Sequence, residues 1–150
     1  MAVAGKENPQ LFGVWKAYKS ENMAALMEKA GAPWMARKMG ANATPTVTMT
    51  RLDDRRISIS SKTMMFNMEQ VHELDTLVQG DMAMAGKQVE YYTEWTDDGK
   101  LVVYQADVGA GGDLKTTGMK TVRSLEPNGE MLVTVSMDNV VAYRWFKRQT

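Results

Sequence analysis

Apolar and polar residues alternate with a period of two over much of this chain. Because side chains alternate between the two faces of a β-strand, this pattern predicts strands with one buried face. Nine stretches are strand candidates: 11–20, 47–50, 57–60, 70–74, 89–95, 101–105, 120–123, 131–135 and 140–147. Turn-forming runs such as Asp97-Asp98-Gly99 and Pro127-Asn128-Gly129 separate several of them. We therefore expect an all-β antiparallel meander, closed into a barrel so that no sheet edge remains.

Helical spacing replaces this alternation between the first two strands. Met23, Leu26, Met27 and Ala30 recur at the spacing of one helix face, after Ser20 or Asn22 as candidate cap. Gly31 is expected to end this helix, and a second short helix should run over 34–39 and end at Gly40. Residues 21–40 are therefore predicted to form a helical lid. Residues 1–10 are polar and are expected to form a flexible tail.

Two arginines fall on strand faces that are otherwise apolar. In the last strand, Arg144 is in step with Val140, Ala142 and Phe146, and Arg123 is also in step with an apolar position. Burying a guanidinium without a partner costs several kcal/mol, and no Asp or Glu shares these two faces. The pattern indicates that a bound ligand supplies the negative charge. The alternative is a structural network of waters and hydroxyl groups.

Composition narrows the classes of function. The chain of 150 residues predicts one domain, residues 1–150. Its 18 basic and 18 acidic residues give no net charge, which argues against nucleic-acid binding. It has no cysteine and only one histidine, His72, so neither a thiolate nucleophile nor a multi-histidine metal site is expected. No stretch approaches the ~20 apolar residues that cross a bilayer. We therefore expect a soluble intracellular protein that is not an enzyme. His72 is either a ligand contact or an ordinary interior side chain.

Several segments of this chain resemble the intracellular lipid-binding proteins, the family of fatty-acid-binding and cellular retinoid-binding proteins. The segments that carry the resemblance are Phe12-Gly13-Val14-Trp15-Lys16, Ser20-Glu21-Asn22, Gly31, Arg37-Lys38, Pro45, Lys62-Thr63, Asp98-Gly99-Lys100-Leu101, Gln105, Arg123 and Arg144. They follow the family's order over almost the whole chain.

The resemblance implies a ten-stranded antiparallel up-and-down β-barrel of the lipocalin-like (calycin) type, capped by a helix-turn-helix lid. Arg123 and Arg144 fall on the positions that hold a ligand carboxylate in the family. Phe146 falls where the family often has a tyrosine, and phenylalanine has no hydroxyl to donate. Met65 falls near the portal, where phenylalanine is usual. Longer hairpin loops are expected around 81–86 and 109–113.

The remaining candidate ligand contacts are Met23 and Leu26 on the inner face of the lid, and Gln105. The function that the resemblance implies is that of a non-enzymatic cytoplasmic carrier of one long-chain fatty acid, with no cofactor besides this ligand. It also implies a monomer that makes transient membrane contact during ligand transfer. Two alternatives stay open: a carrier of a retinoic-acid-type ligand, and a structural or stress-protective barrel without a dedicated ligand.

Overall fold

A computed structural model describes residues 4–64, 67–82, 87–109 and 111–149 of the chain. Ten strands and two α-helices follow a short 3₁₀ turn. The elements are η1 (Pro9–Leu11), β1 (Gly13–Glu21), α1 (Met23–Lys29), α2 (Trp34–Gly40), β2 (Thr46–Arg51), β3 (Arg56–Lys62), β4 (Asn67–Glu73), β5 (Leu77–Met82), β6 (Lys87–Trp95), β7 (Leu101–Asp107), β8 (Met119–Leu125), β9 (Met131–Met137) and β10 (Val140–Arg148).

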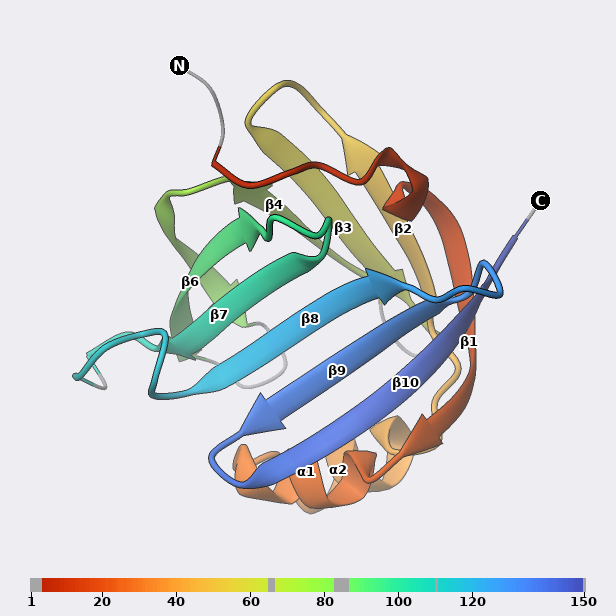
Figure 1. Ribbon diagram of the computed structural model, residues 1–150. Coiled ribbons are helices and arrows are strands. Elements are labelled where there is room, and N and C mark those ends of the chain that lie inside the picture. The colour runs from red at the N-terminus through yellow and green to blue at the C-terminus, as the bar shows by residue number, and fades with distance from the viewer. Residues whose placement is uncertain (1–3, 65–66, 83–86, 110, 150) are drawn as a thin grey trace.

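The strands form one antiparallel sheet in the order β4-β3-β2-β1-β10-β9-β8-β7-β6-β5. The sheet curls into a nearly closed barrel, and the two helices lie across one of its ends (Figure 1). Each strand pairs with the next one in the chain except β4, which does not pair with β5. In addition, β1 pairs with β10, from Trp15 opposite Arg148 to Glu21 opposite Tyr143. The predicted all-β meander barrel with a helical lid is confirmed.

Strand β5 is absent from the nine strands that the alternation predicts. Its sequence, LVQGDM, contains Gly80 and Asp81, two residue types that are depleted in strands. Pairing with β6 nevertheless holds it extended, from Leu77 opposite Tyr92 to Met82 opposite Lys87. Asp81 is therefore a strand residue, not part of the longer loop expected at 81–86, and residues 83–86 lie outside the described residues. The other long connection is confirmed, since β7 ends at Asp107 and β8 begins at Met119.

The barrel retains two sheet edges, which corrects the expectation of full closure. Strands β4 and β5 are the two ends of the sheet order and have no ladder between them. Directly after β4, Leu74 forms an isolated bridge with Thr93 of β6. This bridge connects the two sides of the seam. Tyr91 of β6 also crosses the seam, and its hydroxyl donates to the carbonyl of Val71 at 3.1 Å. A Cβ on Gly80 would lie 3.1 Å from the Tyr91 ring, so glycine leaves room for this crossing.

The N-terminal segment makes contacts where a free tail was expected. The amide of Lys6 donates to the carbonyl of Thr96 at 3.0 Å, and the side chain of Leu11 is fully buried. Figure 1 shows this segment running across the end of the barrel opposite the helices. Residues 4–11 therefore cover the second end of the barrel.

Interior packing is dense near the N-terminal segment and looser near the helices. Trp15, Leu101 and Met131 are completely buried and lie in the same apolar cluster as Leu11. Inward positions at the helical end are only partly buried, as Met119 and Met137 show. Since native interiors are close-packed, partly exposed inward side chains indicate space inside the barrel near the lid.

Replacing Tyr91 by phenylalanine should weaken the seam. The change removes the hydroxyl and leaves the Val71 carbonyl without that donor, which should lower the free energy of unfolding by about 1 kcal/mol. Tyr143→Phe is the matched control, because the Tyr143 hydroxyl makes no hydrogen bond in the described part of the chain. Urea denaturation of both variants measures the difference. Equal stabilities would mean that the hydroxyl does not hold β4 against β6.

Candidate functional site

The two arginines predicted from the sequence lie on the same inward face of the barrel. Arg123 of β8 and Arg144 of β10 are both paired in register with Val133 of β9. Directly paired residues point to the same side of an antiparallel sheet, and Val133 is buried in the core. The two arginines are two strands apart, which places their Cα atoms about 10 Å from each other. Side chains of this length can converge on one small anionic group.

Arg144 has partners within the protein, which the sequence did not reveal. Its Nε donates to the hydroxyl of Ser20 at 2.9 Å, and its Nη2 donates to the carbonyl of Gly40 at 3.0 Å. Ser20 lies near the end of β1 before the lid, and Gly40 is the last residue of α2. The guanidinium therefore ties both ends of the lid to β10. Burial lowers the pKa of Arg144.

Arg123 has no such partner. Its Nε is completely enclosed and donates no hydrogen bond within residues 4–64, 67–82, 87–109 and 111–149. No Asp or Glu pairs with its guanidinium in these ranges, and burial alone lowers the pKa of Arg123 to about 10. The group is still protonated at neutral pH. A positive charge thus faces the interior with unused donors, as expected for a site that receives an anion.

His72 is a further titratable group inside the barrel. It is 3% exposed, and its Nδ1 lies 2.9 Å from the Thr93 hydroxyl oxygen. Its ring lies 4.9 Å from the ring of Tyr91, centroid to centroid. Burial, with the nearby charge of Arg123 as a smaller cause, lowers the pKa of His72 to about 3. The imidazole is therefore neutral at physiological pH.

These groups give the barrel one polar interior wall. Thr93, Val103 and Thr121 are paired in one row across β6, β7 and β8, next to the row that contains Arg123. Gln105 is paired with Tyr91 and with Met119 in the following row, toward the helical end. The opposite wall is apolar. Val47, Met49, Ile57 and Ile59 of β2 and β3 line it.

The other predicted ligand contacts fall into three groups. On the lid helix α1, Leu26 is buried and Met23 is half-buried, so α1 turns its predicted apolar face inward. Phe146 is 3% exposed, belongs to the dense core and is paired with Ala17 and Met131. Met65 lies outside the described residues. In the lid, Asn22 makes no side-chain cap and instead donates from its side chain to the carbonyl of Val141 at 2.9 Å.

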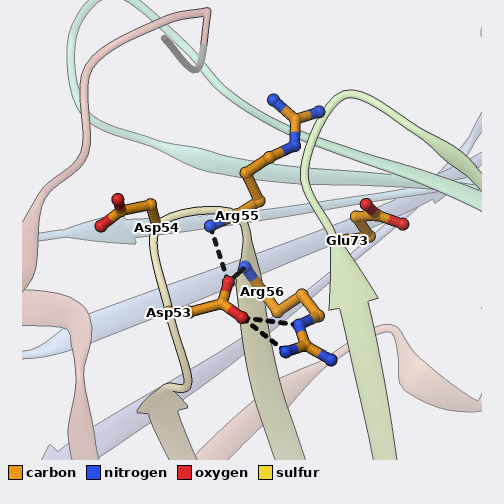
Figure 2. Close-up of a pocket in the computed structure, with 5 residues that line it drawn as sticks. All are labelled: Asp53, Asp54, Arg55, Arg56 and Glu73. Atoms are coloured by element: carbon orange, nitrogen blue, oxygen red, sulfur yellow. Dashed lines mark hydrogen bonds and ion pairs between the residues drawn. The ribbon is translucent and has the colours of Figure 1, made fainter. Parts of the chain in front are cut away.

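A separate hollow lies on the outer surface, at the turn between β2 and β3. Figure 2 shows the residues that line it, which are Asp53, Asp54, Arg55, Arg56 and Glu73. The carboxylate of Asp53 accepts hydrogen bonds from the backbone amides of Arg55 and Arg56 and from the Arg56 guanidinium. The guanidinium of Arg55 donates to the carbonyl of Leu74 at 2.8 Å. These contacts stabilise the turn between β2 and β3. The candidate site is therefore placed in the interior of the barrel.

Within the described residues, no cluster of three or more His, Asp or Glu side chains could hold a metal ion. None of the described helices is both long enough and apolar enough to span a bilayer.

Comparison with known proteins agrees with the barrel and its two helices. The model of the lipocalin / cytosolic fatty-acid binding protein family matches residues 12–149. This chain belongs to that family.

Individual relatives cover nearly the whole chain. A fatty acid-binding protein of Tyrophagus putrescentiae is 30% identical over 140 residues, which are 93% of this chain and 98% of the relative. Cellular retinoic acid-binding protein 2 of Rattus norvegicus is 26% identical over 145 residues, covering 94% and 99%. The solved structure of a Schistosoma mansoni fatty acid binding protein in complex with arachidonic acid matches with a TM-score of 0.82 at 26% identity. It covers 97% of this chain and 100% of that one.

The depressed pKa of His72 should be measurable as a dependence of stability on pH. The unfolded chain binds a proton near pH 6.5, whereas the folded state binds it only near pH 3. Stability is therefore lost as the pH falls below 6.5, by about 1.4 kcal/mol per pH unit, or about 2 kcal/mol by pH 5. His72→Gln should lack this loss and serves as the control. Urea denaturation at pH 7 and pH 5 tests this, and equal pH dependence in both proteins would contradict it.

Proposed function

We propose that this protein is a non-enzymatic carrier that holds one long-chain fatty acid inside the barrel. The observation that carries the proposal is the unpartnered guanidinium of Arg123, which faces the interior without an acidic side chain beside it in the described structure. A ligand carboxylate would supply the missing charge and accept its hydrogen bonds. The names of the relatives agree with this chemistry, since several are fatty acid-binding proteins.

The ligand's apolar tail would lie toward the lid, where inward side chains are only partly buried. Burying about fifteen methylene groups at ~0.8 kcal/mol each contributes roughly 12 kcal/mol before the costs of ordering and desolvation. The tail would therefore provide most of the affinity, and the carboxylate would fix the ligand's direction. Met23, Leu26, Gln105 and Met65 are the proposed contacts along it.

The two arginines would have different roles. Arg123 is free to bind the carboxylate, whereas Arg144 already donates to Ser20 and Gly40. Arg144 would reach the carboxylate only by sharing its guanidinium with these partners, or through water. We therefore assign Arg123 as the main anchor and Arg144 as a secondary contact that also holds the lid. Phe146 lies two positions after Arg144 on the same face of β10 but adds no donor.

A ligand of the retinoic-acid type is the second candidate. It is also a hydrophobic carboxylate, and one relative of similar coverage is named a cellular retinoic acid-binding protein. The remaining alternative is a protective barrel without a ligand. Native mass spectrometry of the purified protein distinguishes the three by the presence and mass of a co-purified carboxylate.

The carrier would act as a cytoplasmic monomer and would need no cofactor besides the bound ligand. Transient contact with membranes is the proposed route of ligand transfer. Its support is on α2, where Trp34 and Met35 are each 59% exposed and Met39 is 44% exposed, beside the basic Arg37 and Lys38. Such a surface combines apolar side chains with positive charge, as interfacial helices do.

Arg123→Met should separate ligand binding from stability. Affinity for oleate should fall at least about tenfold, since charge-assisted hydrogen bonds contribute about 1.5–3 kcal/mol. Stability should stay the same or rise, because a buried unpaired cation is removed. Isothermal titration calorimetry and thermal melts measure the two effects.

Arg144→Met is the matched control for this experiment. It removes two hydrogen bonds within the protein, so stability should fall by about 1–2 kcal/mol while oleate binding falls less than in Arg123→Met. If Arg123→Met binds oleate as well as the unchanged protein, Arg123 is not the anchor.

The lid should open more easily than the barrel. Its helices have seven residues each, and helices this short depend on tertiary contacts for stability. Amide hydrogen exchange in the ligand-free protein should therefore be faster over 23–40 than over β9 and β10, and oleate should slow it most in the lid. If oleate does not change the rate of amide exchange in the lid, the ligand does not enter the barrel through the end that the helices cover.

A further inference from the structure

We propose that His72 is a specificity-determining residue of the interior, which donates a hydrogen bond from Nε2 to the ligand carboxylate beside Arg123. This inference rests on the proposed carrier function. It adds a neutral donor to the head-group site, at a residue for which the sequence left the role open.

Only one of the two ring nitrogens of His72 has a hydrogen-bond partner in the described structure. Its neighbours Val71 and Glu73 are more exposed, so the imidazole points into the barrel. Its Nδ1 is engaged by the Thr93 hydroxyl at 2.9 Å. Its Nε2 makes no hydrogen bond in the described structure, in which Trp95 Nε1 and Arg123 Nε are the completely enclosed polar side-chain atoms without a partner. Nε2 is therefore open to the interior space.

His72 and Arg123 face the same part of that space. Thr93, which holds the imidazole, is paired through Val103 with Thr121, and Thr121 is the inward neighbour of Arg123 on β8. The charge of Arg123 is close enough to act on the imidazole's protonation. A carboxylate bound by the guanidinium would thus lie within reach of Nε2.

The hydrogen-bond chemistry is consistent with one tautomer. A neutral imidazole has one donor and one acceptor nitrogen, and a hydroxyl can serve as either. When the Thr93 hydroxyl donates to Nδ1, the proton is on Nε2, where it can be donated to a carboxylate oxygen. Arg123 then balances the ligand's charge, and His72 contributes direction without adding charge. A methyl ester would lose the charge-assisted contact to Arg123 and keep only a weaker acceptor for His72.

Because His72 is the only histidine in the chain, its imidazole gives one set of nitrogen signals. Protein with ¹⁵N-labelled histidine should show an Nε2-protonated neutral ring when saturated with oleate, and its Nε2 proton should become slow to exchange with water. Methyl oleate should change this signal less. An unchanged Nε2 signal at full oleate occupancy would overturn the proposal.

Two variants complete the test by calorimetry. His72→Leu removes the donor and should weaken oleate binding about fivefold to tenfold, with little change for methyl oleate. His72→Gln offers an amide donor at the same place and should recover part of the loss. Equal losses for acid and ester in His72→Leu would mean that His72 only packs against the ligand, and would overturn its role as a donor.

The outcomes also separate this inference from the carrier function. If the unchanged protein binds oleate in a manner that depends on Arg123 while His72 does not respond, the inference fails and the carrier function stands. If the unchanged protein does not bind oleate or another hydrophobic carboxylate, both fail together.

Discussion

An uncompensated positive charge inside a β-barrel is the constraint around which this structure is organised. Desolvation makes a buried guanidinium unfavourable unless something neutralises it, and lowers the pKa of Arg123 to about 10. The residues that the structure describes accommodate this charge without pairing it. Neutral Thr93, Thr121 and Gln105 share the wall with Arg123, and the acidic side chains that form ion pairs in the described ranges lie at the surface. Stability is thereby given up at the position that we propose binds the ligand carboxylate.

Two inward arginines in the same row serve two different purposes. Arg144 connects β10 to both ends of the lid through Ser20 and Gly40. Arg123 remains available two strands away. The helical lid is therefore coupled to the same row of the sheet as the proposed head-group site. An anion that drew Arg144 toward Arg123 would compete with the contacts that keep the lid in place.

The sequence predicted those features that depend on local pattern. Alternation located nine strands, and the spacing of Met23, Leu26 and Met27 gave the inward face of α1. Strand β5 was missed, because Gly80 and Asp81 weaken its own preference and pairing with β6 supplies the order. Features such as β5 depend on pairing between strands, which local sequence patterns do not reveal.

In the candidate site, too, some features follow from local sequence patterns and others from contacts between residues far apart in the chain. The inward direction of Arg123 and Arg144 follows from alternation alone. The partners of Arg144 do not, since Gly40 lies 104 residues away and offers only a backbone carbonyl. The contact between His72 of β4 and Thr93 of β6 forms across the open seam between β4 and β5, which no local pattern indicates.

The pairing of β1 with β10 has a consequence for how the protein is made. Arg148 donates to the carbonyl of Phe12, 136 residues away, and lies over the ring of Trp15. During synthesis, β1 emerges early and its edge toward β10 stays unpaired until almost all the other strands exist. Contacts between such distant residues slow folding, and an amphipathic edge left open favours association between chains. Until β10 has been made, the edge of β1 that faces it therefore has no partner strand.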